Sequence, residues 1–202
     1  MKKRFLMATV MAAISAPAFA GTEIDGRLST LGYGLGVGFQ ATDSVVARIG
    51  INQFNKTYTK TSGQVNYSGN LKLSSADLLA DWHLFGGVTH LTAGLVYNNN
   101  KVDLTAANPT INGVTYTGQT LNSSVTFNKV APYLGFGWSG QAKNKGLSFN
   151  SDFGVLFQGK PKASVTGSGN ATADATAQSD LESSLNNFRY YPVISFGIGY
   201  AF

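Results

Sequence analysis

The last thirteen residues, 190–202, alternate between two kinds of side chain over their whole length. Every second position is large and apolar or aromatic: Tyr190, Pro192, Ile194, Phe196, Ile198, Tyr200 and Phe202. The positions between them are mostly small, and no charged residue follows Arg189. Successive strand residues point to opposite faces, and a soluble antiparallel sheet normally turns a polar face to water. The pattern favours a strand with a lipid-facing outer side and a narrow barrel interior on the other. A buried strand of a secreted sandwich is the alternative.

The first twenty residues have the three parts of a secretory signal peptide. A basic start, Lys2-Lys3-Arg4, precedes an apolar run over residues 5–15 and a small-x-small site at Ala18-Phe19-Ala20. The apolar run is too short to cross a bilayer as a mature helix. We therefore expect a cleavable signal peptide at 1–20 and one outer-membrane β-barrel at 21–202.

Composition excludes several other classes of protein. Three of the 15 lysines and arginines fall in the signal segment and all 10 acids follow it, so the remaining chain carries about +2. That charge gives no reason to expect a nucleic-acid partner. The chain has no cysteine, so an exported protein of this kind needs stability from a source other than disulfides. A hydrogen-bonded barrel supplies it.

The rest of the chain divides into eight alternating segments: 22–28, 31–41, 45–57, 66–84, 89–104, 125–138, 147–157 and 190–202. Connections near 29, 43, 86 and 143 are short, whereas those near 62, 114 and 175 are longer. This layout predicts an all-β fold, an eight-stranded antiparallel up-and-down transmembrane β-barrel with both termini in the periplasm. The segment 164–187 is rich in small polar residues and is predicted to be a mobile loop.

Side-chain parity assigns an outer and an inner face to each segment. In 31–41 the outward residues are Leu31, Tyr33, Leu35, Val37 and Phe39, and the glycines between them face inward, where they leave room for long side chains. A change of parity near Ser74-Ser75 predicts a bulge. Aromatic residues lie near the predicted strand ends, as in interfacial girdles. No charge falls on the central outward positions, where one would cost roughly 2–4 kcal/mol.

The same parity places seven charged residues in the lumen: Glu23, Arg27, Arg48, Lys72, Asp77, Asp81 and Asp152. Eight strands enclose a space that side chains nearly fill. One interpretation is a plug of ion pairs, since unpaired buried charges are costly. The other is a selectivity path in which acids attract a cationic solute.

Several stretches resemble a known family. APYLGFGW at 131–138, FGVLFQGKPKASVTG at 153–167 and the final YYPVISFGIGYAF are similar to CarO-like outer-membrane proteins. STLGYGLGVGFQ at 29–40 and ADWHLFGG at 80–87 resemble the broader group of eight-stranded barrels. The resemblance implies a narrow barrel in the cell outer membrane and a transport role, since the family is associated with uptake of small basic amino acids. It transfers no substrate-contacting residue, because the shared stretches are strands and turns.

Catalytic signals are weak. The two histidines, His83 and His90, flank a predicted turn, and Asp81 lies close by, but no G-x-S-x-G elbow accompanies them. The same three residues could bind a metal, but the sequence supports such a site no better than it supports catalysis. We expect no enzyme activity, no cofactor and no metal.

Two functions remain. The leading one is a narrow, porin-like channel or uptake protein for small solutes, and the alternative is a non-conducting structural or adhesive barrel acting through its external loops. Expected partners are outer-membrane lipid and lipopolysaccharide, periplasmic chaperones and the barrel-assembly machinery during biogenesis. We expect a monomer.

Overall fold

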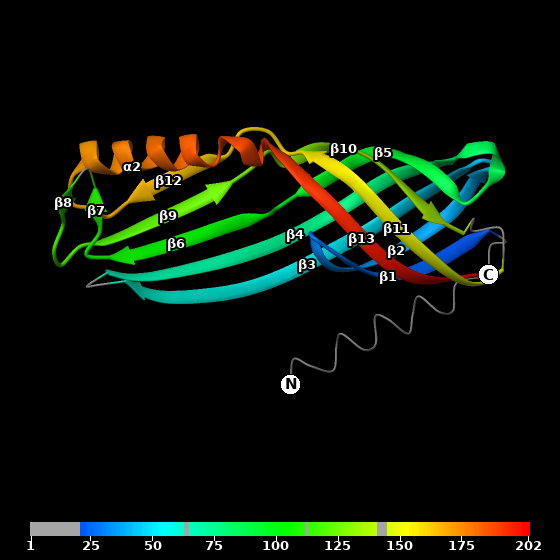
Figure 1. The fold of residues 1–202 in the computed structure, drawn as a ribbon, viewed down its shortest axis with the longest axis horizontal. Coiled ribbons are helices and arrows are strands. Elements are labelled where there is room, and N and C mark those ends of the chain that lie inside the picture. Colours follow the sequence, from blue (N-terminus) through cyan, green and yellow to red (C-terminus); the bar gives the residue numbers. More distant parts are fainter. Residues whose placement is uncertain (1–20, 63–64, 112, 141–144) are drawn as a thin grey trace.

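The computed structural model describes residues 21–62, 65–111, 113–140 and 145–202. The predicted signal peptide lies outside them. Eight strands form a ring (Figure 1): β1 (Thr22–Ser29), β2 (Gly32–Thr42), β3 (Val45–Ser62), β4 (Val65–His83), β5 (Thr89–Asn98), β10 (Val130–Ser139), β11 (Gly146–Phe157) and β13 (Tyr190–Ala201). A short 3-10 turn, η2 (Leu84–Gly86), joins β4 to β5. No described helix is long and apolar enough to span a membrane.

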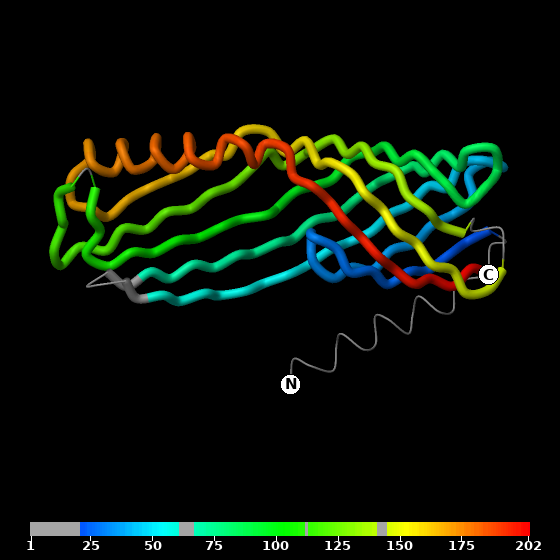
Figure 2. The backbone as a smooth tube through the Cα atoms, in the orientation of Figure 1, coloured from blue at the N-terminus to red at the C-terminus, as the bar shows by residue number. Residues whose placement is uncertain are grey.

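Each ring strand pairs antiparallel with the next one along the chain. The order runs β4-β3-β2-β1-β13-β11-β10-β5, and β5 pairs back to β4 over nine residue pairs from Ser75↔Asn98 to His83↔His90. The first and last strands meet from Glu23↔Ala201 to Ser29↔Ser195. The predicted antiparallel arrangement of eight strands is confirmed. Figure 2 shows that the ring strands run obliquely to the long axis of the molecule.

Beyond the ring, the chain continues as an open sheet. β3 and β4 extend past the other strands, and β6 (Lys101–Ala107), β9 (Thr120–Thr126) and β12 (Lys162–Thr166) join them in the order β12-β9-β6-β4-β3. We call this part the extension sheet. A small hairpin, β7 (Thr110–Ile111) and β8 (Val114–Thr115), lies at its far end (Figure 1). Helix α2 (Ala171–Ser184) runs along the β12 edge, and η3 (Asn186–Arg189) leads back into β13.

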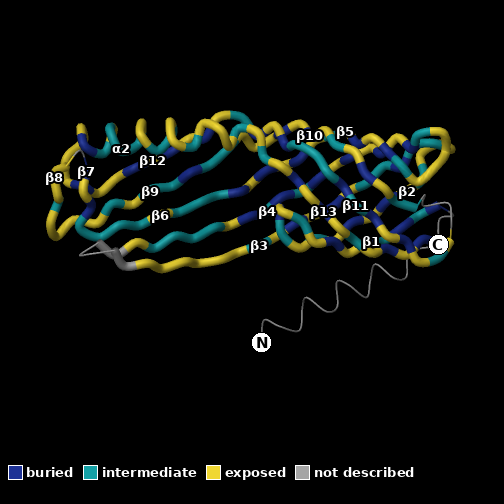
Figure 3. Tube along the Cα trace, in the orientation of Figure 1, coloured by how far each residue is buried: buried dark blue, intermediate teal, exposed yellow. Residues whose placement is uncertain are grey.

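Burial alternates along the ring strands, as their sequence alternates (Figure 3). The outward side chains are large, apolar and exposed; examples are Leu35, Ile51, Leu78, Leu95, Leu134, Phe149 and Phe196. Several inward positions of β2 and β3 are occupied by glycine. A side chain at these positions would collide with the side chains that fill the lumen. A Cβ on Gly50 would lie 2.8 Å from Oδ1 of Asp77 and would also overlap the guanidinium of Arg27.

Several predictions about local structure are wrong. The predicted strands 89–104 and 125–138 are interrupted at residues 99–100 and 127–129, and their remaining residues belong to β6 and β9 of the extension sheet. Leu31 is 5% exposed, because it lies in the β1–β2 turn and folds over the ring mouth instead of continuing the outward parity of β2. The register of β3 and β4 is continuous from Val45↔Trp82 to Ser62↔Val65, so there is no bulge at residues 74–75. The segment 164–187 contains the end of β12 and helix α2, and both are packed against each other.

Candidate functional site

The ring interior is layered along its axis, and the layer nearest the chain termini is charged. Arg48 on β3 donates from Nη2 to Oδ1 of Asp81, at 2.9 Å, and to Oδ1 of Asp152, at 2.9 Å. Its Nη1 donates to the second oxygen of Asp152 at 3.1 Å. Thr92 on β5 donates to Asp81 at 2.7 Å. One guanidinium thus joins carboxylates from two strands, β4 and β11, in the bidentate geometry that suits arginine.

A second cluster lies further from the termini. Nη2 of Arg27 donates to Asp77 Oδ1 at 3.2 Å, and both side chains are almost fully buried. Asn52 donates from Nδ2 to the other oxygen of Asp77, at 2.9 Å, and to Oγ of Ser75 at 3.3 Å. The cluster therefore combines one ion pair with neutral donors that satisfy the remaining lone pairs, which buried charges require.

Two further acids give the interior an excess of negative charge. Glu23 accepts a hydrogen bond from Ser148, and Asp25 lies on the same face of β1. Oδ1 of Asp25 has no hydrogen-bond partner among the described residues. Five carboxylates and two arginines in the described interior leave a formal charge of −3, not counting the histidines.

An apolar layer covers the charged layers on the side of the extension sheet. It consists of Leu31, Leu79, Val96, Ala131, Tyr133, Leu156 and Val193, all buried, with Tyr191 packed against them. A cavity of about 30 Å³ lies between this layer and the Arg27–Asp77 pair. That volume holds about two water molecules. The described side chains therefore leave little free volume at this level of the ring.

A buried amide layer lies above the apolar one. Asn98 donates to Oε1 of Gln158 at 3.1 Å, and Gln158 donates to the carbonyl of Phe188 in η3 at 2.7 Å. The connection between α2 and β13 is tied by this bond across the mouth of the ring.

Comparison with known proteins finds solved structures of similar fold. No family model and no curated protein matches the sequence. Two crystal structures from Acinetobacter baumannii, of CarO2 and CarO, are similar, with TM-scores of 0.63 and 0.62. The fold is that of CarO. The likeness covers 90% and 91% of this chain and 98% of each of those chains, at 20% sequence identity. The predicted CarO resemblance is confirmed at the level of the fold.

Within this CarO-like ring, six of the seven predicted lumen charges lie inside: Glu23, Arg27, Arg48, Asp77, Asp81 and Asp152. The seventh prediction is wrong, because Lys72 is exposed on the outer face of the extension sheet. The predicted bulge at residues 74–75 had moved Lys72 from the outward to the inward face, and the continuous register of β3 and β4 excludes that bulge. Asp25 belongs with the interior charges, and its parity with Glu23 and Arg27 was sufficient to place it.

One of the two histidines, His90, takes part in the charged layer. Nε2 of His90 lies 3.1 Å from Oδ1 of Asp152, and its Nδ1 lies 3.2 Å from Oγ of Ser139. This connectivity is that of a Ser-His-Asp triad. However, Arg48 is hydrogen-bonded to the same carboxylate of Asp152, and His90 is fully buried. His83 instead hydrogen-bonds through Nδ1 to the carbonyl of Gly87, at 2.9 Å.

The same histidine belongs to a group that resembles a metal site. Asp81, His90 and Asp152 each turn one donor atom to within 4.8 Å of the others. The guanidinium of Arg48 is hydrogen-bonded to both carboxylates and supplies the positive charge there. A cation would have to displace it, so the arrangement favours an ion-paired structural role.

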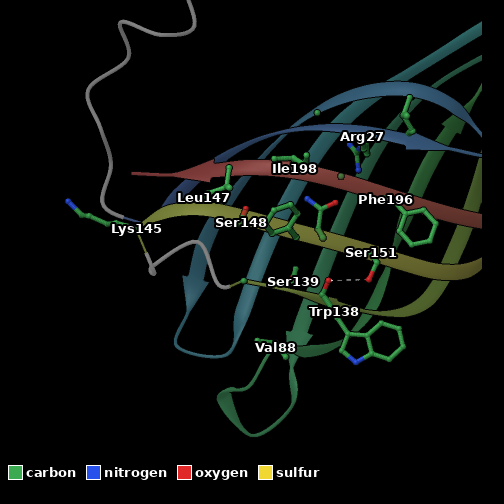
Figure 4. A pocket seen from close by; sticks show the side chains of 16 residues that line it. Arg27, Val88, Trp138, Ser139, Lys145, Leu147, Ser148, Ser151, Phe196 and Ile198 are labelled. Atoms are coloured by element: carbon green, nitrogen blue, oxygen red, sulfur yellow. Dashed lines mark hydrogen bonds between the residues drawn. The ribbon is translucent and has the colours of Figure 1, made fainter.

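A second hollow lies toward the end of the ring that carries the termini (Figure 4). Its volume is about 1050 Å³, and Trp138, Phe196 and Ile198 are among its apolar lining residues. Ser151 donates to the carbonyl of Trp138 at 3.5 Å on the same outward surface. Trp138, Phe196 and Ile198 belong to the exposed apolar surface of the ring, whereas Arg27, Ser148 and Asn150, which also line the hollow, are buried and face the interior.

Proposed function

We propose that this chain is an outer-membrane β-barrel protein that crosses the bilayer with its eight ring strands. The outward surface of the described ring carries no charged side chain, although its large apolar residues are exposed. Aromatic residues bound this surface on both sides, with Tyr33, Tyr97 and Tyr190 toward the extension sheet and Trp82 and Tyr200 toward the termini. An apolar band between aromatic girdles is the signature of a barrel in lipid.

A row of lysines supports an external position for the extension sheet. Lys72, Lys101 and Lys162 lie on its outer face, in one line of paired residues that also includes Asn55 and Thr126. The row follows directly beyond the apolar band. Its cations suit the phosphates of lipopolysaccharide, because ammonium groups attract anionic headgroups. Both termini then lie in the periplasm.

The interior supports a barrel that does not conduct and that acts through the extension sheet. This function is supported mainly by the apolar layer, whose buried side chains fill most of the described interior above the charged clusters. Nearly half of the chain beyond the signal segment contributes to structure outside the band. We assign no catalytic role to the interior.

A narrow channel for small cationic solutes is the second candidate. The interior excess of three negative charges favours it, because acids in a pore attract cations. In that case the apolar layer is a gate that must open before solute passes.

Conductance in a planar bilayer separates the two functions. We expect the refolded wild-type protein to be silent, and Leu156→Ser, which opens the apolar layer, to give small cation-preferring currents. Val155→Ser changes the neighbouring outward residue and should stay silent. Steady wild-type currents that weaken in Asp77→Asn and Asp152→Asn would instead establish the channel.

Protease treatment of intact cells tests the orientation. Cleavage confined to the extension sheet supports the proposal, whereas loss of a C-terminal tag from intact cells contradicts it.

A further inference from the structure

A cleft opens between α2 and the inward face of the extension sheet, outside the proposed membrane band. Its volume is about 340 Å³, within the range of small-molecule sites. We call it the helix–sheet cleft and define it by Tyr58, Lys60, Tyr67, Leu104, Leu121 and Leu181. It lies on the opposite side of the sheet from the lysine row.

The strand register builds the floor. Tyr58, Gly69, Leu104, Ser123 and Val165 pair in one line from β3 to β12. Paired residues share a face, so this line points into the cleft. The next line contains Lys60, Tyr67, Ala106 and Leu121. The floor is therefore apolar over β6 and β9 and aromatic toward β3.

Helix α2 forms one wall. Ala173, Ala177 and Leu181 recur every four residues and so lie on one face of the helix. Ala173 is buried, and Ala177 and Leu181 line the cleft. Oε1 of Glu182 accepts a hydrogen bond from the backbone N–H of Ala163 at 2.9 Å, which ties the helix to β12.

The edge of the floor toward β3 combines two tyrosines with a cation. Tyr58 is 59% exposed and Tyr67 is 48% exposed, an unusual degree of exposure for aromatic side chains that flank an apolar floor. Lys60 is the charged side chain among the described lining residues, and Nζ of Lys56 lies 5.8 Å from the centre of the Tyr58 ring. Two acids of α2 are engaged elsewhere, since Asp174 accepts from Gly167 and Ser168, and Glu182 accepts from Ala163. Asp180, the third, lies outside the lining.

We propose that the helix–sheet cleft binds a compact soluble organic anion with an aromatic or aliphatic body and a carboxylate at one end. The body packs on Leu104, Leu121 and Leu181 between the helix and the tyrosines, and the carboxylate pairs with Lys60. The volume admits a molecule of one or two rings, and Lys60 is the only cation among the described lining residues. This inference rests on the proposed function, because it gives the extension sheet a ligand.

The test uses the full mature chain in zwitterionic lipid nanodiscs, with empty nanodiscs as a blank. The probes are 2-naphthoate, neutral 2-naphthylmethanol and cationic 2-naphthylmethylammonium, followed by saturation-transfer NMR and calorimetric titration. We expect naphthoate to bind about fivefold more tightly than the alcohol, as one partly exposed ion pair allows. The cation should bind most weakly.

Paired variants locate the site. Lys60→Gln should remove the preference for naphthoate over the alcohol, and Ala177→Trp should abolish binding by filling the cleft. Lys72→Gln removes a charge from the outer face of the same sheet, and Ala175→Trp adds a ring to the exposed side of α2, so both should bind as wild type does.

Equal binding of all three probes, or unchanged binding in Ala177→Trp, would overturn the proposal. Conductance measurements separate the proposed ligand of the cleft from the proposed non-conducting function of the barrel. A silent barrel that does not bind naphthoate rejects the ligand alone, whereas a conducting barrel that binds it rejects the non-conducting function alone.

Discussion

Arg48 lies between two carboxylates from strands that are 33 and 104 residues away along the chain. Its side chain is 11% exposed, so the three charges are largely removed from water. Each charge would be costly to bury alone, and only their mutual contacts make the charged layer stable. The same contacts leave little freedom for a solute at this level of the ring.

Replacing Arg48 by methionine should destabilise the barrel by about 3–5 kcal/mol, because Asp81 and Asp152 would lose their common cation. Denaturant unfolding in lipid vesicles measures the loss. Lys72→Met is the matched control, since Lys72 is exposed on the outer face, and its effect should stay within about 0.5 kcal/mol. Equal losses in the two variants would show that the network does not hold the ring together.

At the scale of elements, α2 shows how a helix can arise in a stretch of small polar residues. Asn170 is its N-cap, and its side chain accepts from the N–H groups of Thr172 and Ala173. Asp174 lies in the first turn, where the helix dipole favours an acid, and it accepts from Gly167 and Ser168. Packing against β12 completes the stabilisation, because short helices are marginal alone.

The hydrogen bonds from Ser168 lower the pKa of Asp174 below its ordinary value. A depressed carboxyl pKa adds stability above the unfolded value and loses it as pH falls through the folded value. The start of α2 should therefore loosen below about pH 4, and Asp174→Asn should loosen it at pH 7. Hydrogen exchange of the amides of residues 167–174 measures both effects. Asp180→Asn, further along the helix, is the control, and equal loosening there would contradict this role.

At the scale of the whole molecule, the apolar band and the polar extension sheet divide one continuous set of strands. β3 and β4 pass from one environment to the other without a break in register. Their outward residues are apolar in the ring, and become polar from Gln53 and Ser74 onward. The change of side chains, and not of backbone, marks where lipid is expected to end.

An arginine on the outward face should report that boundary. Leu134→Arg places a charge near the middle of β10 and should cost about 2–4 kcal/mol in a bilayer. Ser124→Arg lies on the outer face of β9 in the extension sheet and should cost less than about 0.5 kcal/mol. Unfolding free energies in vesicles provide the comparison. A similar cost at the two positions would mean that the extension sheet also lies in lipid.

The sequence by itself determined the eight ring strands and their two faces, because a period of two is a local property that each segment carries alone. It also placed six interior charges correctly. It did not reveal that the segments 89–104 and 125–138 each break into two strands. The predicted bulge at residues 74–75 reversed the parity of the strand before it, and Lys72 was therefore assigned to the wrong face. Leu31 was misplaced because a turn residue no longer follows the parity of the strand.

Only the tertiary structure decided which interior groups meet. Arg48 with Asp81 and Asp152, and His90 with Ser139, come together through pairings between distant strands that no local pattern encodes. The apolar layer and the helix–sheet cleft arise in the same way. Each is made of single residues contributed by several elements. The packing of the apolar layer and the volume of the cleft therefore depend on how those elements pack.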